Sequence, residues 1–207
     1  MRLLFVGAHP DDEEVAAGTL VKFKEDYGCD LFILILSPCI ESALQIGMLP
    51  SVLEREFKQS MRVLGIPKTN VFRAGFPSRN FPQFRQGILD KMIEVREKIQ
   101  PTMIITLHSE DRHQDHCVVS EECTRAFPDI TILGAEVPKN PINAKHKCYV
   151  QLEDRHVNKK LECLRCYKSQ QRRKNNNEEI TMASLSLRGA QSGKGLAEAF
   201  EVISLYL

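Results

Sequence analysis

The sequence predicts an α/β fold, a three-layer sandwich around a mostly parallel, Rossmann-like sheet. Two observations predict it: short apolar runs recur along the chain, and longer amphipathic stretches lie between them. Strands that alternate with helices pair in parallel, and parallel strands this apolar are covered by helices on both faces. The length of 207 residues predicts a single domain over residues 1–207, large enough to bury a sizeable core.

Four short apolar runs are the predicted parallel strands: Leu3–Val6, Leu31–Leu36, Val71–Phe72 and Met103–Leu107. The first predicted helix has apolar side chains at helical spacing from Val15 to Tyr27, and Gly28 is its stop signal. Two more helices are predicted over Val52–Leu64 and Ile88–Ile99. The C-terminal part is less regular. It predicts, in order, a strand at Ile132–Val137, a turn at 138–141, a strand at Cys148–Leu152, a helix at Arg155–Tyr167 and a polar loop at Arg172–Glu179.

The composition argues against several classes of function. Lys+Arg 28 and Asp+Glu 27 leave a net charge of +1, too small to attract nucleic acid or an anionic membrane by charge. No apolar stretch approaches the ~18 residues of a transmembrane helix, and the N-terminal run is too short for a signal peptide. Seven cysteines, an odd number, favour reduced thiols. We therefore expect a cytoplasmic protein that binds neither nucleic acid nor membranes.

Two clusters of histidines and carboxylates follow predicted strands. The first runs from His9 to Glu13 after the first strand, and the second runs from His108 to His116 after the fourth. In doubly wound sheets these two strands are commonly neighbours at the point where the strand order reverses, and ligands bind at that edge. We therefore expect the two clusters to face one crevice.

Histidine nitrogens and carboxylate oxygens, three from the protein, are the ligands of a catalytic zinc site. A bound divalent ion lowers the pKa of water and polarises a carbonyl, which is what hydrolysis of an amide requires. A spare carboxylate and a spare histidine would then transfer protons. Each cluster alone also fits an ordinary acidic or solvated helix start, but their occurrence at two matching strand ends favours the functional interpretation. The glycine spacing of a dinucleotide site is absent after the first strand.

The Ala8-His9-Pro10-Asp11-Asp12-Glu13 and His113-Gln114-Asp115-His116 segments resemble the paired motifs of the PIG-L (LmbE-like) family of zinc-dependent N-acetylglucosaminyl deacetylases. Later segments extend the resemblance along the chain: Leu64-Gly65, Tyr167–Gln170, Arg188–Gly193 and Ala197–Phe200. The resemblance implies an α/β deacetylase with Zn²⁺ as cofactor, although mixed nitrogen and oxygen ligands also suit another divalent metal. It also suggests a homo-oligomer.

Carried over by position, the resemblance implies specific roles for residues of both motifs. The implied metal ligands are His9, Asp12 and His116. Asp11 is the implied general base, and His113 is the general acid or the transition-state stabiliser. Asp115 would orient a ligand histidine or brace the helix start.

The resulting hypothesis is that a metal-bound water, deprotonated by Asp11, attacks the acetamide of an N-acetylated amino sugar of the N-acetylglucosamine type, or of its conjugate. His113 then protonates the leaving amine and acetate is released. Two alternatives remain: an amidase acting on a sugar–thiol conjugate, and a catalytically idle sugar-binding protein of the same fold. Candidate substrate contacts, chosen as polar side chains, are Arg55, Arg79, Asn140 and Arg188.

Overall fold

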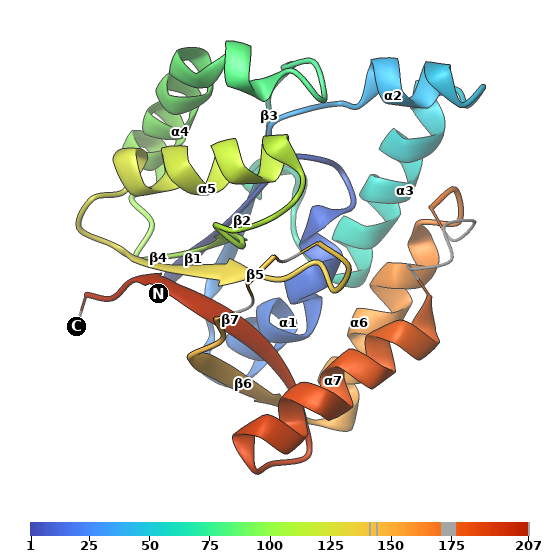
Figure 1. The fold of residues 1–207 in the computed structure, drawn as a ribbon, viewed down its shortest axis with the longest axis vertical. Helices are drawn as coiled ribbons and strands as arrows, with labels where there is room; N and C mark the ends of the chain where they lie inside the picture. The colour runs from blue at the N-terminus through green and yellow to red at the C-terminus, as the bar shows by residue number, and fades with distance from the viewer. Residues whose placement is uncertain (141, 144, 171–176, 207) are drawn as a thin grey trace.

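The computed structural model describes residues 1–140, 142–143, 145–170 and 177–206, and a seven-stranded sheet in the order β3-β2-β1-β4-β5-β7-β6 runs through it (Figure 1). Strands β1 to β5 pair in parallel, whereas β7 lies antiparallel between β5 and β6. The strands are β1 (Arg2–Gly7), β2 (Asp30–Ile35), β3 (Val71–Arg73), β4 (Met103–Leu107), β5 (Thr131–Ala135), β6 (Cys148–Leu152) and β7 (Leu196–Ser204). The predicted mostly parallel sheet is confirmed.

Helices cover both faces of the sheet, which gives the three predicted layers (Figure 1). The helices are α1 (Ala17–Tyr27), α2 (Ile40–Gln45), α3 (Pro50–Val63), α4 (Arg85–Ile99), α5 (Gln114–Ala126), α6 (Asp154–Cys166) and α7 (Glu178–Ser192). Helices α4 and α5 pack together on one face, α6 packs against α1 and α3 on the other, and α7 packs on β7. None of the helices in these described ranges is long and apolar enough to cross a membrane.

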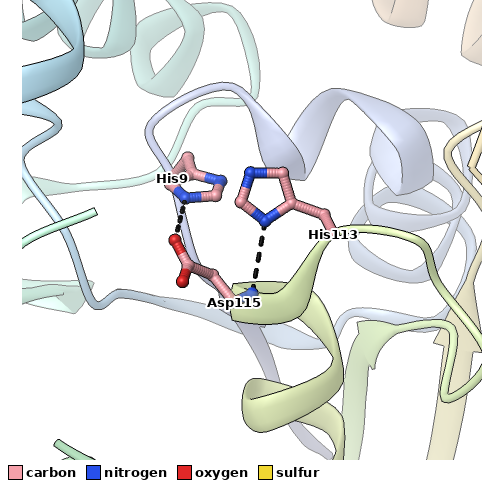
Figure 2. A group of neighbouring side chains, drawn as sticks. All are labelled: His9, His113 and Asp115. Atoms are coloured by element: carbon pink, nitrogen blue, oxygen red, sulfur yellow. Dashed lines mark hydrogen bonds and ion pairs between the residues drawn. The ribbon is translucent and has the colours of Figure 1, made fainter. Parts of the chain in front are cut away.

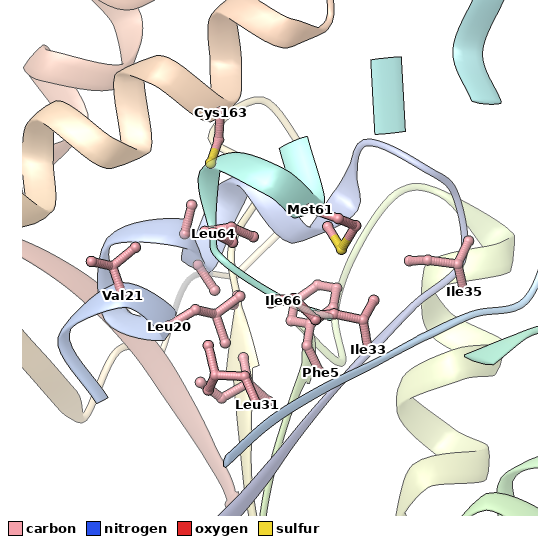
Figure 3. Close-up of a cluster of buried hydrophobic side chains, with 14 of the residues drawn as sticks. Phe5, Leu20, Val21, Leu31, Ile33, Ile35, Met61, Leu64, Ile66 and Cys163 are labelled. Atoms are coloured by element: carbon pink, nitrogen blue, oxygen red, sulfur yellow. The ribbon is translucent and has the colours of Figure 1, made fainter. Parts of the chain in front are cut away.

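Two buried apolar clusters lie on opposite sides of the sheet. Successive side chains of a strand point to opposite faces, so in β1 Leu3 and Phe5 join one cluster while Leu4 and Val6 join the other. Figure 3 shows the first cluster, in which Phe5 packs with side chains from α1, β2, α3 and α6. Full burial of a side chain of this size contributes roughly 1.5–3 kcal/mol, so β1 is held firmly from both faces.

The N-terminal elements follow the sequence prediction closely. A 3-10 helix over Asp12–Ala16 precedes α1, and Gly28 ends α1 in the left-handed conformation with a φ of 62°, as its stop signal predicts. Helix α3 begins at Pro50, slightly before the predicted start, because proline suits the first turn of a helix.

The C-terminal part holds two long elements that the sequence analysis did not predict, α7 and β7. Residues 178–179 of the predicted polar loop are the first turn of α7, which Asn177 caps by accepting the N–H of Ile180 at 2.9 Å. Residues 172–176 of that loop, and Pro141 of the predicted turn, lie outside the described residues. Strand β7 was missed because its two partners are antiparallel and distant in sequence, which local periodicity does not reveal.

Candidate active site

The two motif clusters meet at one edge of the sheet. Strands β1 and β4 are direct neighbours, with Leu3 opposite Met103 and Phe5 opposite Ile105. The segments that follow their carboxyl ends therefore lie side by side, as the strand-order argument predicts. A cavity of about 230 Å³ opens there, and the side chains of Asp11, Asp12 and His113 are part of its lining.

Three buried side chains in this cavity present ligand atoms to one another. His9 Nδ1 lies 3.3 Å from His116 Nε2 and 3.6 Å from Asp12 Oδ2, and His116 Nε2 lies 3.4 Å from Asp12 Oδ1. Zinc binds nitrogen and oxygen at about 2.1 Å, so two ligands at a tetrahedral angle lie about 3.4 Å apart. The separations and the donor set of His9, Asp12 and His116 thus fit a zinc ion.

A carboxylate holds the other ring nitrogen of each of these two histidines. His9 Nε2 lies 3.0 Å from Asp115 Oδ2, and His116 Nδ1 lies 2.9 Å from Asp111 Oδ2. Both carboxylates also accept backbone N–H groups: Asp111 that of His113 at 2.7 Å, and Asp115 that of Arg79 at 2.6 Å. Carboxylates in this position fix the orientation of metal-binding histidines and make them better ligands.

A second group that could hold a cation contains His9, His113 and Asp115 (Figure 2). Two of its members are already engaged at the start of α5: His113 Nδ1 accepts the N–H of Asp115 at 3.3 Å, and the Asp115 carboxylate binds His9 and two backbone N–H groups. Figure 2 shows Asp115 joined to both imidazoles, to His9 through its carboxylate and to His113 through its backbone nitrogen. We therefore favour the set that contains Asp12 and His116 as the metal ligands.

The charges of the buried carboxylates and histidines also suit this site to a cation. Burial by itself would lower the pKa of His9 and of His116, but Asp12 and the two orienting carboxylates raise these values to about 9 and about 10. Burial likewise would raise the pKa of Asp12, yet the two histidines hold it well below its usual range. The protonated imidazoles therefore balance the charge of the buried carboxylates here. A divalent cation can take the place of those protons. Burial and then the charges of His9 and His116 lower the pKa of His113 to about 4.

The candidate substrate contacts are placed differently from one another. Arg79, Asn140 and Arg188 line the cavity, whereas Arg55 is exposed on α3 and is not part of the lining. Arg79 has a left-handed backbone with a φ of 66°, which its N–H bond to Asp115 supports, and its Nη1 donates to Gln45 at 2.6 Å.

The side chain of Asn140 helps to lower the pKa of Asp111, the carboxylate that binds His116. The Arg188 guanidinium is bound by Glu136. The roles of Asp111 and Glu136 as partners of His116 and Arg188 were not predicted, although both residues follow strands whose carboxyl ends face the cavity. The rule that gathers polar residues at such strand ends would have included them.

Comparison with known proteins places this arrangement in a family. The sequence model described as PIG-L, GlcNAc-PI de-N-acetylase, matches residues 4–127, which include both motifs. The chain belongs to the PIG-L family. The resemblance inferred from the two motifs is therefore confirmed.

Relatives of this PIG-L chain are consistent with the assignment. Among curated proteins, the "Uncharacterized deacetylase YaiS" of Escherichia coli (strain K12) is 25% identical over 182 residues, covering 81% of this chain and 90% of that protein. Among solved structures, the zinc-inhibited form of teicoplanin deacetylase Orf2 has a TM-score of 0.80 at 13% identity and covers 97% of both chains. N,N'-diacetylchitobiose deacetylase from Pyrococcus horikoshii has a TM-score of 0.75 at 17% identity and covers 98% of this chain and 83% of its own. These structural likenesses show a shared fold.

Proposed function

We propose that residues 1–207 form a single deacetylase domain, a metal-dependent hydrolase that removes the acetyl group from an N-acetylated amino sugar or its conjugate. The observation that carries this proposal is the spacing of His9, Asp12 and His116, three buried side chains that line the cavity and whose ligand atoms lie 3.3–3.6 Å apart. Family membership supports the same reaction class. We propose Zn²⁺ as the metal, because the donor set and spacing suit it.

The metal ligands in this proposal are His9, Asp12 and His116. A divalent ion bound there supplies a water of lowered pKa and polarises the amide carbonyl. Asp111 and Asp115 hold the two imidazoles with their second nitrogens occupied, which leaves His9 Nδ1 and His116 Nε2 for the ion. This division of the ring nitrogens supports the ligand assignment.

Asp11 and His113 move the protons in this proposal. Asp11 lines the cavity immediately before the ligand Asp12, and it accepts a proton from the water that attacks the carbonyl carbon. Since Nδ1 of His113 accepts the N–H of Asp115, its Nε2 is left for the reaction. In this neutral form the Nε2–H group hydrogen-bonds the developing oxyanion, and Asp11 returns the proton it took from the water to the leaving amine; a His113 protonated at both ring nitrogens would give that proton to the amine instead. As the carbon–nitrogen bond breaks, the products are acetate and the free amino sugar.

The sugar class is proposed from the relatives and the cavity together. One structural relative is named for N,N'-diacetylchitobiose and another for teicoplanin, and both are called deacetylases. Arg79, Asn140 and Arg188 give the cavity wall hydrogen-bond donors that suit sugar oxygens. A sugar–thiol conjugate amidase would use the same metal and proton-transfer groups and differs by releasing a larger acid than acetate.

The deciding experiment combines metal analysis with an acetate assay on N-acetylglucosamine derivatives, using wild type, His116→Ala and Asp11→Asn. The proposal expects stoichiometric metal and acetate release in wild type, loss of both in His116→Ala, and loss of acetate release alone in Asp11→Asn. Metal binding without acetate release, together with release of a larger acid from a sugar–thiol conjugate offered as a second substrate, would favour the amidase. Binding of sugar without any hydrolysis would favour the idle sugar-binding protein and contradict the proposal.

A further inference from the structure

A second polar cluster lines the cavity beside the metal ligands, and it is built around Arg188 of α7. Nε and Nη2 of Arg188 donate to the two carboxylate oxygens of Glu136, each at 2.8 Å, and Nη1 donates to Gln191 at 2.8 Å. On its other side Glu136 lies 2.8 Å from Nε2 of His146. Glu136 and Arg188 line the cavity, and the bonds of Arg188 to Glu136 and Gln191 fix the plane of the guanidinium.

The side chains of Glu136, His146 and Arg188 are largely removed from solvent, whereas Gln191 is exposed. The Glu136 side chain is 8% exposed, that of His146 3% and that of Arg188 14%. A buried guanidinium with a carboxylate partner is costly to assemble, because both charges lose their hydration. A site that serves only packing would be filled as well by apolar side chains, so the arrangement points to a role for the Arg188 donors.

Arg188 retains donors that the cluster does not use. A guanidinium has five N–H groups, and three of them make the bonds to Glu136 and Gln191. Within the described ranges, no acceptor pairs with the other two. Because Glu136 balances the charge of Arg188, the pair offers directed N–H groups with little net charge, which suits a neutral hydroxyl oxygen better than an anion.

The topology sets how far this cluster lies from the reacting atoms. Glu136 directly follows β5, and β5, β4 and β1 are consecutive strands of the sheet, with Leu107 opposite Ala135. Neighbouring strands are about 4.8 Å apart, so the ends of β1 and β5 are separated by roughly 10 Å. That span matches one pyranose ring with its substituents, with the acetamido group at the metal ligands and a hydroxyl at the Arg188 end.

We propose that Arg188 is a specificity-determining residue that donates to a ring hydroxyl of a neutral amino sugar, and that Glu136, His146 and Gln191 are positioning residues for it. This inference rests on the proposed function and adds the recognition of an uncharged sugar ring at a defined wall of the cavity.

The test changes the protein at Arg188 and the sugar at one hydroxyl, separately and together, and compares the binding affinities. The zinc-loaded Asp11→Asn protein, with and without Arg188→Met, is titrated by calorimetry with N-acetylglucosamine and with analogues that each lack one ring hydroxyl. In the Arg188-containing protein, one analogue is expected to bind roughly 10- to 100-fold more weakly than the parent sugar. In Arg188→Met that difference disappears while the metal content stays that of the parent protein; the melting temperature falls because the buried Glu136 carboxylate loses its partner, so binding is measured well below it. Arg188→Lys, which keeps the charge without the fork, serves where Arg188→Met does not fold, and there the difference shrinks.

The chain contains a matched control. Arg165 binds Glu178 with the same two-bond geometry, Nε and Nη2 at 2.7 Å each, on an exposed surface that is not part of the cavity. Arg165→Met and Glu178→Gln are expected to leave sugar binding unchanged. Glu136→Gln is expected to bind the neutral sugar more weakly and to gain relative affinity for N-acetylglucosamine phosphate, because the charge of Arg188 loses its balance.

The outcomes separate this inference from the proposed function. Discrimination that depends on Arg188 in the binding assay, with no acetate released by the Asp11-containing enzyme, supports the inference and contradicts the proposed function. Acetate release with an unaltered parent-to-analogue ratio in Arg188→Met overturns the inference alone. Failure of the Asp11→Asn protein to bind any sugar of the panel overturns the inference as well, and so does an equal effect of Arg165→Met.

Discussion

The hydrogen bond between Asp111 and His116 makes a quantitative prediction about metal affinity. Asp111→Asn keeps the shape of the side chain and an oxygen acceptor near His116 Nδ1, which lies 2.9 Å from Asp111 Oδ2, but removes the negative charge. The ligand itself is untouched. Weaker metal binding in this variant would therefore measure what the orienting carboxylate contributes to the imidazole.

The magnitude follows from the burial of the pair. Asp111 and His116 are each 4% exposed, so solvent screens their interaction little. A hydrogen bond to a charged group contributes about 1.5–3 kcal/mol and one between neutral groups about 0.5–1.5 kcal/mol. The difference of roughly 1–1.5 kcal/mol corresponds to about a tenfold rise in the Kd for zinc, at the lower end of the roughly 10- to 100-fold range of such orienting groups.

The assay is a competition for zinc between the protein and a chromophoric chelator at fixed pH. Asp26→Asn is the matched control, because Asp26 lies 3.5 Å from Nε2 of His156 and does not line the cavity. His116→Ala, which removes a ligand, sets the largest loss. An unchanged Kd in Asp111→Asn would refute the orienting role, and a loss as large as that of His116→Ala would show that Asp111 itself binds the metal.

Proton transfer, acid stability and backbone packing offer three further tests. Asp11→Asn is expected to keep stoichiometric metal while acetate release falls roughly 100- to 10,000-fold; undiminished release would exclude Asp11 as the base. Burial would raise the pKa of Glu136, but bonds to the neighbouring imidazole and guanidinium lower it below 4.5. Its stabilisation is therefore present above pH 4.5 and lost as the pH falls through the lowered value. Thermal melts should accordingly show a deficit for Glu136→Gln that shrinks in acid; a deficit independent of pH would contradict this. A Cβ on Gly189 would clash with the Gly195 carbonyl oxygen, so Gly189→Ala should lose roughly 1–3 kcal/mol in chemical denaturation, whereas Gly75→Ala, with no atom within 4 Å, should lose little.

The parts of the molecule that the sequence predicts well depend on local pattern and on one topological rule. Short apolar runs locate β1, β2 and β4, and Gly28 marks the end of α1 because it adopts a left-handed backbone. The adjacency of β1 and β4 follows from the usual order of doubly wound sheets, and it brings His9 and His116 to one cavity. The positions of the histidines and carboxylates within the two motifs then predict which side chains face one another.

The parts that the sequence does not predict depend on partners distant in the chain. Glu136 and Arg188 are separated by 52 positions, and nothing local marks them as a pair. Strand β7 pairs antiparallel with β5 and β6, so its position depends on a register that only the assembled sheet defines. The exposure of Arg55 depends on which face α3 turns toward the core, and a residue type alone does not decide that.

The first turn of α5 links metal binding to the fold. Asp111, just before this helix, and Asp115, within its first turn, flank His113, and each carboxylate binds one of the histidines proposed as metal ligands together with at least one backbone N–H. Fixing this turn therefore fixes the orientation of both imidazoles, one of which belongs to the segment after β1. The conformational entropy of ordering the ligands is lost when the chain folds, so little remains to be lost when an ion binds. The affinity of the proposed site for a metal then depends on the relative positions of β1, β4 and α5. The backbone N–H of Arg79 donates to Asp115, and Arg79 also lines the cavity where substrate would lie, so the orienting carboxylate contacts both the proposed ligand His9 and the substrate wall.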